Sequence, residues 1–391
     1  MDQPFINNSF GLLAVLLIIP AIIFTIDSHA KYGKLFKFIP PLVFAYFIPT
    51  ILTALGIIPS EAVVYKQIKT FVLPASLLLL TLAVDIKGIL KLGNKAVIMF
   101  LVGTVGVVIG GPIALFIFKN QLPAEIWRGM AALAGSWIGG GANFIAIGKS
   151  VGATDAMLGL MVVVDVLVAN IWTGILLFLA GRYKSIDQKL NADNTMIEEL
   201  KDKVVEFQKK TNRVSTTTEY MVIMALAFGG AWVAYLLGNA LPEFGDIISH
   251  TTWKIIIITT FGVIFSFTNV RNLEGAGASK LGTVMLYLLI GVIGAAADLR
   301  EVVKYPYLFA MGIVWILVHI AIMLTVMKLI KAPLFFMAVG SQANIGGAAS
   351  APIVASAFHP ALATVGVMLG IAGYVVGTYA ALICAALLQM I

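Results

Sequence analysis

The stretch GSWIGGGANF, Gly135 to Phe144, decides the fold because it interrupts an apolar segment with three consecutive glycines. A glycine in a helix interior costs roughly 1 kcal/mol relative to alanine, so three in a row predict a break in the backbone. A second stretch, GSQANIGGAAS at Gly340 to Ser350, repeats the Gly-Ser opening, the asparagine and the glycine cluster in the other half of the chain. The sequence therefore predicts two broken helices at corresponding places.

Composition places the chain in a lipid bilayer. Hydrophobic residues make up 60% of the 391 residues, charged residues only 12%, and the mean hydropathy is +1.00. A soluble domain carries about a quarter charged residues. We therefore expect a multi-pass protein of the cell (inner) membrane. Nucleic acid is not an expected partner despite the net charge of +7, because most Lys and Arg lie between apolar segments, as in cytoplasmic loops. The single cysteine, Cys384, excludes an intrachain disulfide.

Apolar runs of about the 20 residues needed to cross a bilayer recur along the chain. The expected spans lie near residues 9–26, 38–58, 70–90, 95–118, 154–181, 218–238, 253–270, 279–298, 305–330 and 360–388. The two glycine-interrupted stretches, 124–151 and 332–357, add one broken helix to each half. The expected fold class is an all-α polytopic membrane protein with two repeats of about five spans each.

Three segments follow from this pattern. Residues 1–181 form a first transmembrane repeat, 182–217 a polar cytoplasmic linker and 218–391 a second repeat. The linker holds eight Lys/Arg and six Asp/Glu. Its sequence TMIE, at Thr195 to Glu198, is typical of a capping box and precedes apolar residues at 3–4 spacing, which predicts a short amphipathic surface helix. A plain solvated linker fits the composition equally well.

Matches between the halves indicate an internal duplication. AVDIKGI at 83–89 matches AADLREV at 296–302, Gly135-Ser136 matches Gly340-Ser341, and Thr173 lines up with Thr378. Each match alone is weak, but the three occur in the same order.

The topology depends on the broken stretches. If each enters and leaves on one face as a re-entrant hairpin, each half has five crossings, the repeats are inverted, and 18 of the 26 Lys/Arg lie inside when both termini are outside. If each stretch crosses fully, the halves are parallel and 16 of the 26 lie inside. Positive charges collect in cytoplasmic loops, so the inverted arrangement is favoured, and a crossing helix stays open.

The broken backbone itself predicts a binding site. Unwound backbone is tolerated in a membrane only where it is buried in protein or lines a wet cavity, and two such segments at matching places point to a transporter site. The residues expected to bind substrate are Ser136, Gly139, Gly140, Gly141, Asn143, Ser341, Asn344, Gly346, Gly347 and Ser350. Close helix packing is the alternative. Close packing explains a different set of glycines better than it explains the two glycine clusters: the stripe formed by Gly366, Gly370, Gly373 and Gly377.

Asp165 lies in the middle of an apolar span. A charge at the bilayer centre costs at least about 3 kcal/mol and indicates a function. Thr173 lies two turns further on the same face. We expect Asp165, Thr173 and Gln342 to form a cation-coupling site for Na⁺ or a proton, with no other metal and no cofactor. The alternative is a structural carboxylate paired with a neighbouring helix.

The paired glycine-rich breaks in a duplicated chain resemble the cation/proton antiporter–anion symporter superfamily, which includes sodium–glutamate, 2-hydroxycarboxylate and bile acid symporters. In the first two branches hairpin tips carry Gly-Gly-x-Gly-like sequences; GGGAN at 139–143 is similar, whereas NIGGAAS at 344–350 lacks the third glycine. In its overall pattern the chain most resembles an uncharacterised bacterial group of YjcL-type membrane proteins. The resemblance implies inverted repeats, a mobile core domain, a scaffold domain and elevator-like movement.

The expected function is secondary active transport of a small organic solute, anionic or zwitterionic, such as a carboxylate, an amino acid or a small peptide. The lipid bilayer and this solute are the expected partners, and a homodimer through scaffold spans is an option for assembly. No Walker A sequence is present, which argues against an ATP-driven pump. A channel or facilitator is the alternative. An intramembrane enzyme is disfavoured because HExxH and a Cys/His cluster are absent from the sequence.

The charge distribution predicts a cytoplasmic linker and external termini, because no Lys or Arg follows Lys331. Single cysteines placed at Ser215 and at the C-terminus of a chain lacking Cys384 test this with a membrane-impermeant thiol reagent. We expect labelling of the C-terminal cysteine from outside and none at position 215. The reverse pattern contradicts the topology.

Overall fold

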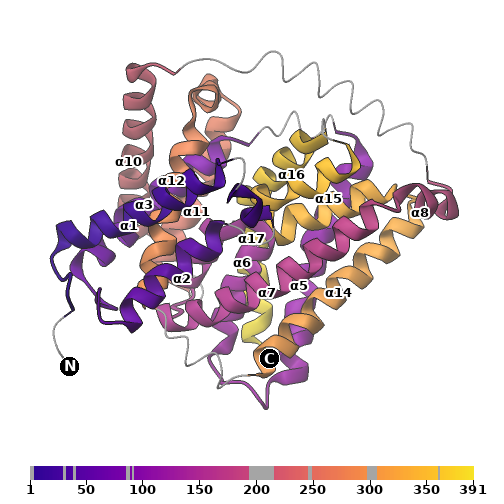
Figure 1. Ribbon diagram of the computed structural model, residues 1–391, viewed down its shortest axis with the longest axis horizontal. Coiled ribbons are helices and arrows are strands. Elements are labelled where there is room, and N and C mark those ends of the chain that lie inside the picture. The colour runs from indigo at the N-terminus through magenta and orange to yellow at the C-terminus, as the bar shows by residue number, and fades with distance from the viewer. Residues whose placement is uncertain are drawn as a thin grey trace.

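The computed structural model describes residues 4–29, 32–37, 41–84, 89, 92–192, 215–244, 249–296, 306–359 and 362–391 (Figure 1). The elements in these ranges are α-helices and two short 3-10 helices. The expected linker helix from Thr195 lies outside the described residues, and so do Asp85 and Asp298, the aspartates of the aligned stretches 83–89 and 296–302.

The helices follow the expected order in each half. The first half contains α1 (Ser9–Asp27), η1 (Tyr32–Lys37), α2 (Pro41–Ala54), α3 (Val63–Leu82), α5 (Asn94–Phe118), α6 (Ile126–Ser150), α7 (Asp155–Ala180) and α8 (Tyr183–Leu190). The second half contains α10 (Thr217–Ala240), α11 (His250–Ser266), η2 (Asn269–Ala276), α12 (Ala278–Ala296), α14 (Tyr307–Leu329), α15 (Leu334–Ile345), α16 (Gly347–Phe358) and α17 (Ala363–Gln389).

Nine of the described helices are long and apolar enough to cross a membrane, or ten if α11 and η2, which meet at 94°, form one bent span. The chain is thus a multi-pass helical protein, as expected. The expected start of the third span near residue 70 is too late, since α3 begins at Val63. Lys66 and Lys69 interrupt the apolar run in its first turns, and Lys69 is able to lie there because its Nζ pairs with Asp155 at 2.5 Å.

The first glycine-rich stretch forms a helical hairpin within α6. Gly140 has φ 73° and ψ −175°, a conformation open to glycine and strained for other residues. A Cβ on Gly148 would lie 3.3 Å from the Cβ of Ala132, whereas sixteen residues of straight helix span about 24 Å. Arg128 near the start of α6 also donates to the carbonyl of Val151 just beyond its end. The two arms therefore fold back on each other at Gly140.

The second glycine-rich stretch forms a second hairpin from α15 and α16. The rings of Phe335, at the start of α15, and Phe358, at the end of α16, have centroids 5.4 Å apart. The turn lies at Gly346 and Gly347, and Gly347 has φ 59°. Figure 1 shows α15 and α16 side by side. Both predicted breaks are confirmed, and in both the chain reverses instead of continuing as one kinked helix.

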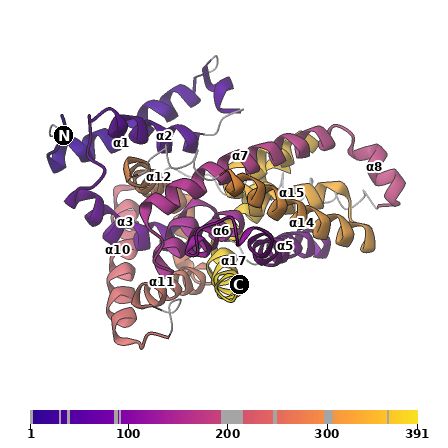
Figure 2. The ribbon, with the colours of Figure 1, turned by 90° about the horizontal axis from the view of Figure 1, so that it is seen from below.

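The glycine stripe of α17 packs against both hairpins, as the packing interpretation predicted. A Cβ on Gly366 or Gly370 would come within about 2.6 Å of backbone atoms of α16, and one on Gly373 or Gly377 within about 2.5 Å of backbone atoms of α6. Figure 2 shows α17 end-on beside α6, with α5 and α11 on either side. Small residues allow this contact between backbones.

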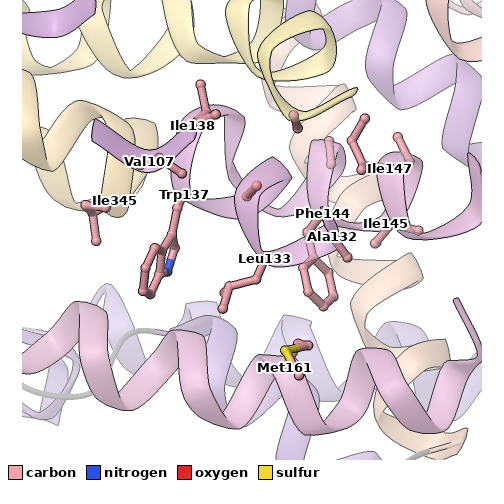
Figure 3. Packing of buried hydrophobic residues seen from close by; sticks show 14 of the residues in the cluster. Val107, Ala132, Leu133, Trp137, Ile138, Phe144, Ile145, Ile147, Met161 and Ile345 are labelled. Carbon is pink, nitrogen blue, oxygen red and sulfur yellow. The ribbon is translucent and has the colours of Figure 1, made fainter. Parts of the chain in front are cut away.

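The helices pack in two groups (Figures 1 and 2). In the α3–α12 group, α3 packs along α12, α2 packs on α12, α11 packs on α3, and α1 and α10 lie outside them. The hairpin group contains α5 and α14, which pack along each other, together with α6, α7, α15, α16 and α17. Figure 3 shows Leu133 and Phe144 of α6 directed toward Met161 of α7, so the first hairpin is packed by apolar side chains on α7.

Gly377→Ala is expected to destabilise the protein by about 1–3 kcal/mol, because the new methyl group meets the Gly139 backbone at 2.5 Å and neither backbone yields easily. Gly229→Ala is the matched control, since a Cβ there has nothing within 4 Å and alanine favours the helix. Thermal unfolding of the purified proteins measures the difference. Equal melting temperatures for the two variants contradict close packing at α17.

Candidate functional site

The two hairpin tips meet beside a cavity with a volume of about 670 Å³. A Cβ on Gly347 would lie 3.8 Å from the Cα of Gly140, so the tips are neighbours. Glycines of both tips line the cavity: Gly140, Gly141, Gly346 and Gly347. The wall opposite comes from the end of α1, from η1 and from α12.

Polar groups on several walls face this cavity. They are Asp27, Ser28, His29, Thr283, Tyr287 and Tyr374. The N-terminus of α16 supplies a further wall through Gly347, Ala348 and Ala349, and no side chain caps it. The first amides of a helix have no partner within the helix, and its positive end favours an anion. The cavity therefore offers backbone donors on one side and the Asp27 carboxylate on another.

A smaller cavity of about 30 Å³ contains Asp165. Asp165 accepts hydrogen bonds from Ser136 Oγ at 2.5 Å and from Trp137 Nε1 at 2.8 Å, so α7 holds the first hairpin through one carboxylate. The lining also includes Tyr46 of α2 and Gly141. Gly141 lines both cavities, so they share this tip residue.

Thr173 of α7 and Gln342 of the second hairpin come together, as expected. Gln342 Nε2 donates to Thr173 Oγ1 at 2.8 Å and to Ser350 Oγ at 2.6 Å. Asp165 lies two turns away along α7 and bonds to the first hairpin instead. The three residues expected to form one coupling site therefore hold two hairpins to one helix.

Asn143 and Asn344 have the same bonding arrangement on the two hairpins. Asn143 Nδ2 donates to the carbonyls of Gly139 and Tyr374, and its Oδ1 accepts from Thr378 Oγ1 at 2.6 Å. In the second hairpin, Asn344 Nδ2 donates to the carbonyls of Gly340 and Phe100, and its Oδ1 accepts from Thr104 Oγ1 at 2.8 Å.

Each amide thus links the carbonyl four residues back in its hairpin to a carbonyl and a threonine four residues apart on a neighbouring helix. For Asn143 the bond to Gly139 crosses the tip at Gly140, whereas for Asn344 the bond to Gly340 lies within one arm. The neighbouring helix is α17 for Asn143 and α5 for Asn344. Both asparagines are fully buried. Their hydrogen-bonding groups are used to fasten the hairpins, and direct contact with a solute stays a prediction.

Ser341 is part of a buried chain that joins four helices. His319 bonds through Nδ1 to the carbonyl of Gly103, so Nδ1 is the donor and the neutral ring accepts at Nε2. Ser341 Oγ lies 2.7 Å from that Nε2 and accepts from Trp172 Nε1 at 2.8 Å. This chain fixes α5, α14, α15 and α7 relative to one another.

The structure thus divides the expected substrate-binding residues. Five of them line a cavity: Ser136, Gly140, Gly141, Gly346 and Gly347. The others take part in the packing and bonding of the hairpins: Gly139, Asn143, Ser341, Asn344 and Ser350. Sequence reasoning missed the lining residues of α1, α2 and α12, because no spacing in the sequence links them to the glycine stretches.

A hydrolase-like sequence, GKSVG at 148–152, also occurs at the end of α6. In hydrolases G-x-S-x-G exposes its serine on a strand-to-helix turn. Here Ser150 is buried at the end of a helix and its Oγ donates to the carbonyl of Ala146 at 3.0 Å. Its own carbonyl accepts hydrogen bonds from Ser249 and Thr252 of α11. The serine is placed as a packing residue.

Two glycine-tipped hairpins packed among long apolar helices, with a cavity beside their tips, define a multi-pass membrane protein. The chain belongs to the family described as protein of unknown function (DUF819), which matches residues 14–391. It is similar to the uncharacterized membrane protein YjcL of Bacillus subtilis (strain 168), with 25% identity over 354 residues that cover 84% of this chain and 85% of that protein. The expected likeness to YjcL-type proteins is confirmed.

Asn344→Ala is expected to destabilise the protein by about 1–3 kcal/mol, because it leaves the buried Thr104 hydroxyl and two carbonyls without the amide. Asn170→Ala is the control, since the Asn170 amide donates to the Val166 carbonyl of its own helix. Thermal unfolding in detergent measures both. An unchanged melting temperature for Asn344→Ala contradicts the conclusion that this asparagine stabilises the hairpin.

Proposed function

We propose that the protein is a secondary active transporter that carries a small organic solute through the larger cavity, driven by Na⁺ or protons. The observation that supports this most is the meeting of two broken, glycine-tipped hairpins at a cavity of about 670 Å³. Cavities of about 300–1,000 Å³ suit small molecules, and paired unwound segments near the centre of the membrane are typical of transporter sites. The proposal includes no catalytic residue and no cofactor.

The hairpins support an inverted repeat. With α6 and the α15–α16 pair as re-entrant hairpins, we take α1, α2, α3, α5 and α7 as the crossings of the first half and α10, α11, α12, α14 and α17 as those of the second. Two of these helices are shorter than a full span, since α2 has 14 residues and α11 has 17 before it bends into η2. An odd number of crossings inverts the second half relative to the first. The packing is consistent with such a relation, because α3 lies along α12 while α2 contacts α12 and α11 contacts α3.

The two helix groups suit an elevator-like movement, in which the α3–α12 group is the scaffold and the hairpin group is the mobile core. The larger cavity is lined by both groups, as alternating access requires. Polar contacts across the boundary include Thr259 to Thr378 at 3.2 Å and Thr260 to Tyr379 at 2.8 Å. A homodimer through the scaffold belongs to the same proposal, with the exposed Met221 and Trp232 of α10 facing lipid or a second copy.

The lining supports an anionic or zwitterionic solute. The uncapped start of α16 offers N–H groups to a carboxylate, as helix N-termini do for anions. Asp27 and the hydroxyls of Thr283, Tyr287 and Tyr374 are available to an ammonium or hydroxyl group on the same solute. Amino acids, short peptides and hydroxy acids combine these features.

A disulfide across the helix groups tests the movement. Thr259 and Thr378 have hydroxyl oxygens 3.2 Å apart, and cysteine sulfurs in their places need a small shift to reach the bonding distance of about 2.05 Å. The solute is first found by thermal-shift screening of carboxylates, amino acids and small peptides. On a Cys384→Ala background, we expect the oxidised double-cysteine variant to lose at least about 90% of solute counterflow in proteoliposomes and to regain it with reductant, since a carrier held in one state cannot cycle.

The two single-cysteine variants serve as controls, because Thr378 also donates to Asn143 and its loss has an effect of its own. Unimpeded counterflow in the oxidised double variant contradicts sliding of the core along α11. Solute flux without trans-stimulation in the unmodified protein indicates a channel or facilitator instead of a carrier.

A further inference from the structure

The Tyr46 hydroxyl is buried without a hydrogen-bond partner in the described part of the chain. The residue is 1% exposed and lies on α2. Its backbone is held firmly, because Thr50 Oγ1 donates both to the Tyr46 carbonyl at 3.0 Å and to the Gly294 carbonyl of α12 at 2.7 Å. Burial of an unpaired hydroxyl is unfavourable, so such a group calls for a ligand.

Tyr46 lines the same cavity as Asp165 and Ser136. The other walls are apolar and include Phe144 and Ile290. The volume of about 30 Å³ holds one body the size of a water molecule. Three residues that carry side-chain oxygens therefore line a space for a single small ligand.

We propose that this cavity binds one Na⁺ ion, with the Asp165 carboxylate, the Ser136 hydroxyl and the Tyr46 hydroxyl as its ligands. Ser136 donates its proton to Asp165, which leaves lone pairs on Ser136 Oγ for a cation. Each carboxylate oxygen of Asp165 accepts one hydrogen bond and keeps a further lone pair. Trp137 holds one of these oxygens in place, so the site is built before the ion arrives.

The charge of the site selects a monovalent ion. Asp165 is the one carboxylate in the lining, so Na⁺ leaves the site neutral, whereas a divalent cation leaves an uncompensated buried charge. Among the described residues, no group of three or more His, Cys, Asp or Glu side chains is placed to hold a divalent metal. Oxygen ligands of this kind suit a hard cation.

The ligands come from both helix groups, Tyr46 from α2 and the other two from α6 and α7. A bound ion therefore fastens the hairpin group to the α3–α12 group. In this respect the inference rests on the proposed transporter, for which it assigns the coupling ion and a place where that ion controls movement of the core. Gly141 lines both this cavity and the larger one, so the ion and the solute would contact the same hairpin tip.

Thermal unfolding of the full-length protein in detergent tests the site, with NaCl exchanged for KCl or choline chloride at constant ionic strength. We expect Na⁺ to raise the melting temperature in a saturable manner, by mass action, and K⁺ and choline to have no such effect. Tyr46→Phe keeps the ring and is expected to weaken the apparent Na⁺ affinity about tenfold or more, because one ligand is lost. Asp165→Asn is expected to abolish the Na⁺ response.

Tyr65→Phe is the matched control. The Tyr65 hydroxyl is also buried without a partner in the described residues, but it lies on α3 and does not line this cavity. Its removal is expected to leave the Na⁺ response as in the unmodified protein. If Tyr46→Phe keeps full Na⁺ affinity, Tyr46 is not a ligand of the ion. This conclusion holds even if Asp165→Asn fails to fold.

An absent Na⁺ response in the unmodified protein overturns the ion site, and a response to pH alone that is lost in Asp165→Asn assigns the cavity to a proton. The measurement uses neither solute nor transport. An intact Na⁺ response together with failed counterflow therefore contradicts the transporter and leaves the ion site standing. Counterflow that proceeds without any Na⁺ response contradicts the ion site alone.

Discussion

The structure depends on one constraint: backbone that leaves the helical conformation in an apolar interior must still have its hydrogen bonds satisfied. Gly140 and Gly347 adopt positive φ and reverse the chain, which removes bonds that a continuous helix would make. Asn143 and Asn344 provide hydrogen bonds close to these two breaks. Each carries donors and an acceptor in one planar group, and each uses them to tie a hairpin arm to the backbone and a threonine of a neighbouring helix.

Helix α7 makes the two hairpins into one unit. Asp165 accepts from Ser136 and Trp137 of the first hairpin, while Trp172 and Thr173 bond to Ser341 and Gln342 of the second. A buried polar network of this kind is favourable only when its members are paired, and it then specifies a single arrangement. Two groups remain unpaired among the described residues of this region, Gln342 Oε1 and the Tyr46 hydroxyl. Tyr46 lines the smaller cavity, where the proposed ion would pair its hydroxyl.

The position of the two cavities gives a physical basis for the proposed coupling of ion and solute. Coupling between two ligands requires that each changes the free energy of the other's bound state. Gly141 lines both cavities, so a small shift of the first hairpin tip alters both at once. Glycine is suited to that place because the absence of a side chain lets ligand and backbone approach closely. Both hairpins, by contrast, are packed at backbone distance against the glycine stripe of α17.

The sequence alone determined the membrane setting, the order of the helices and the two places where the backbone breaks. These are local properties: about 20 apolar residues predict a span, and consecutive glycines destabilise a helix wherever they lie. It also marked Asp165, because a carboxylate in the middle of an apolar run is costly in any fold. The start of α3 was misplaced because Lys69 is compensated by Asp155, which lies far away in the chain.

Only the tertiary structure decided what these residues touch. The number of Lys and Arg residues placed inside was nearly equal for a hairpin and for a crossing helix. Contacts between the two arms, such as that of Phe335 with Phe358, identify the hairpin. An asparagine can either bind a ligand or join two helices, and the sequence does not distinguish these roles for Asn143 and Asn344. The hydrogen bonds from Thr378 and Thr104 show that both asparagines join helices. Tyr46 carries no signal in the sequence at all. Tyr46 becomes a candidate ligand only because α2 packs against the cavity that also contains Asp165, more than a hundred residues away in the chain. Packing between such distant segments is not visible in any local sequence pattern.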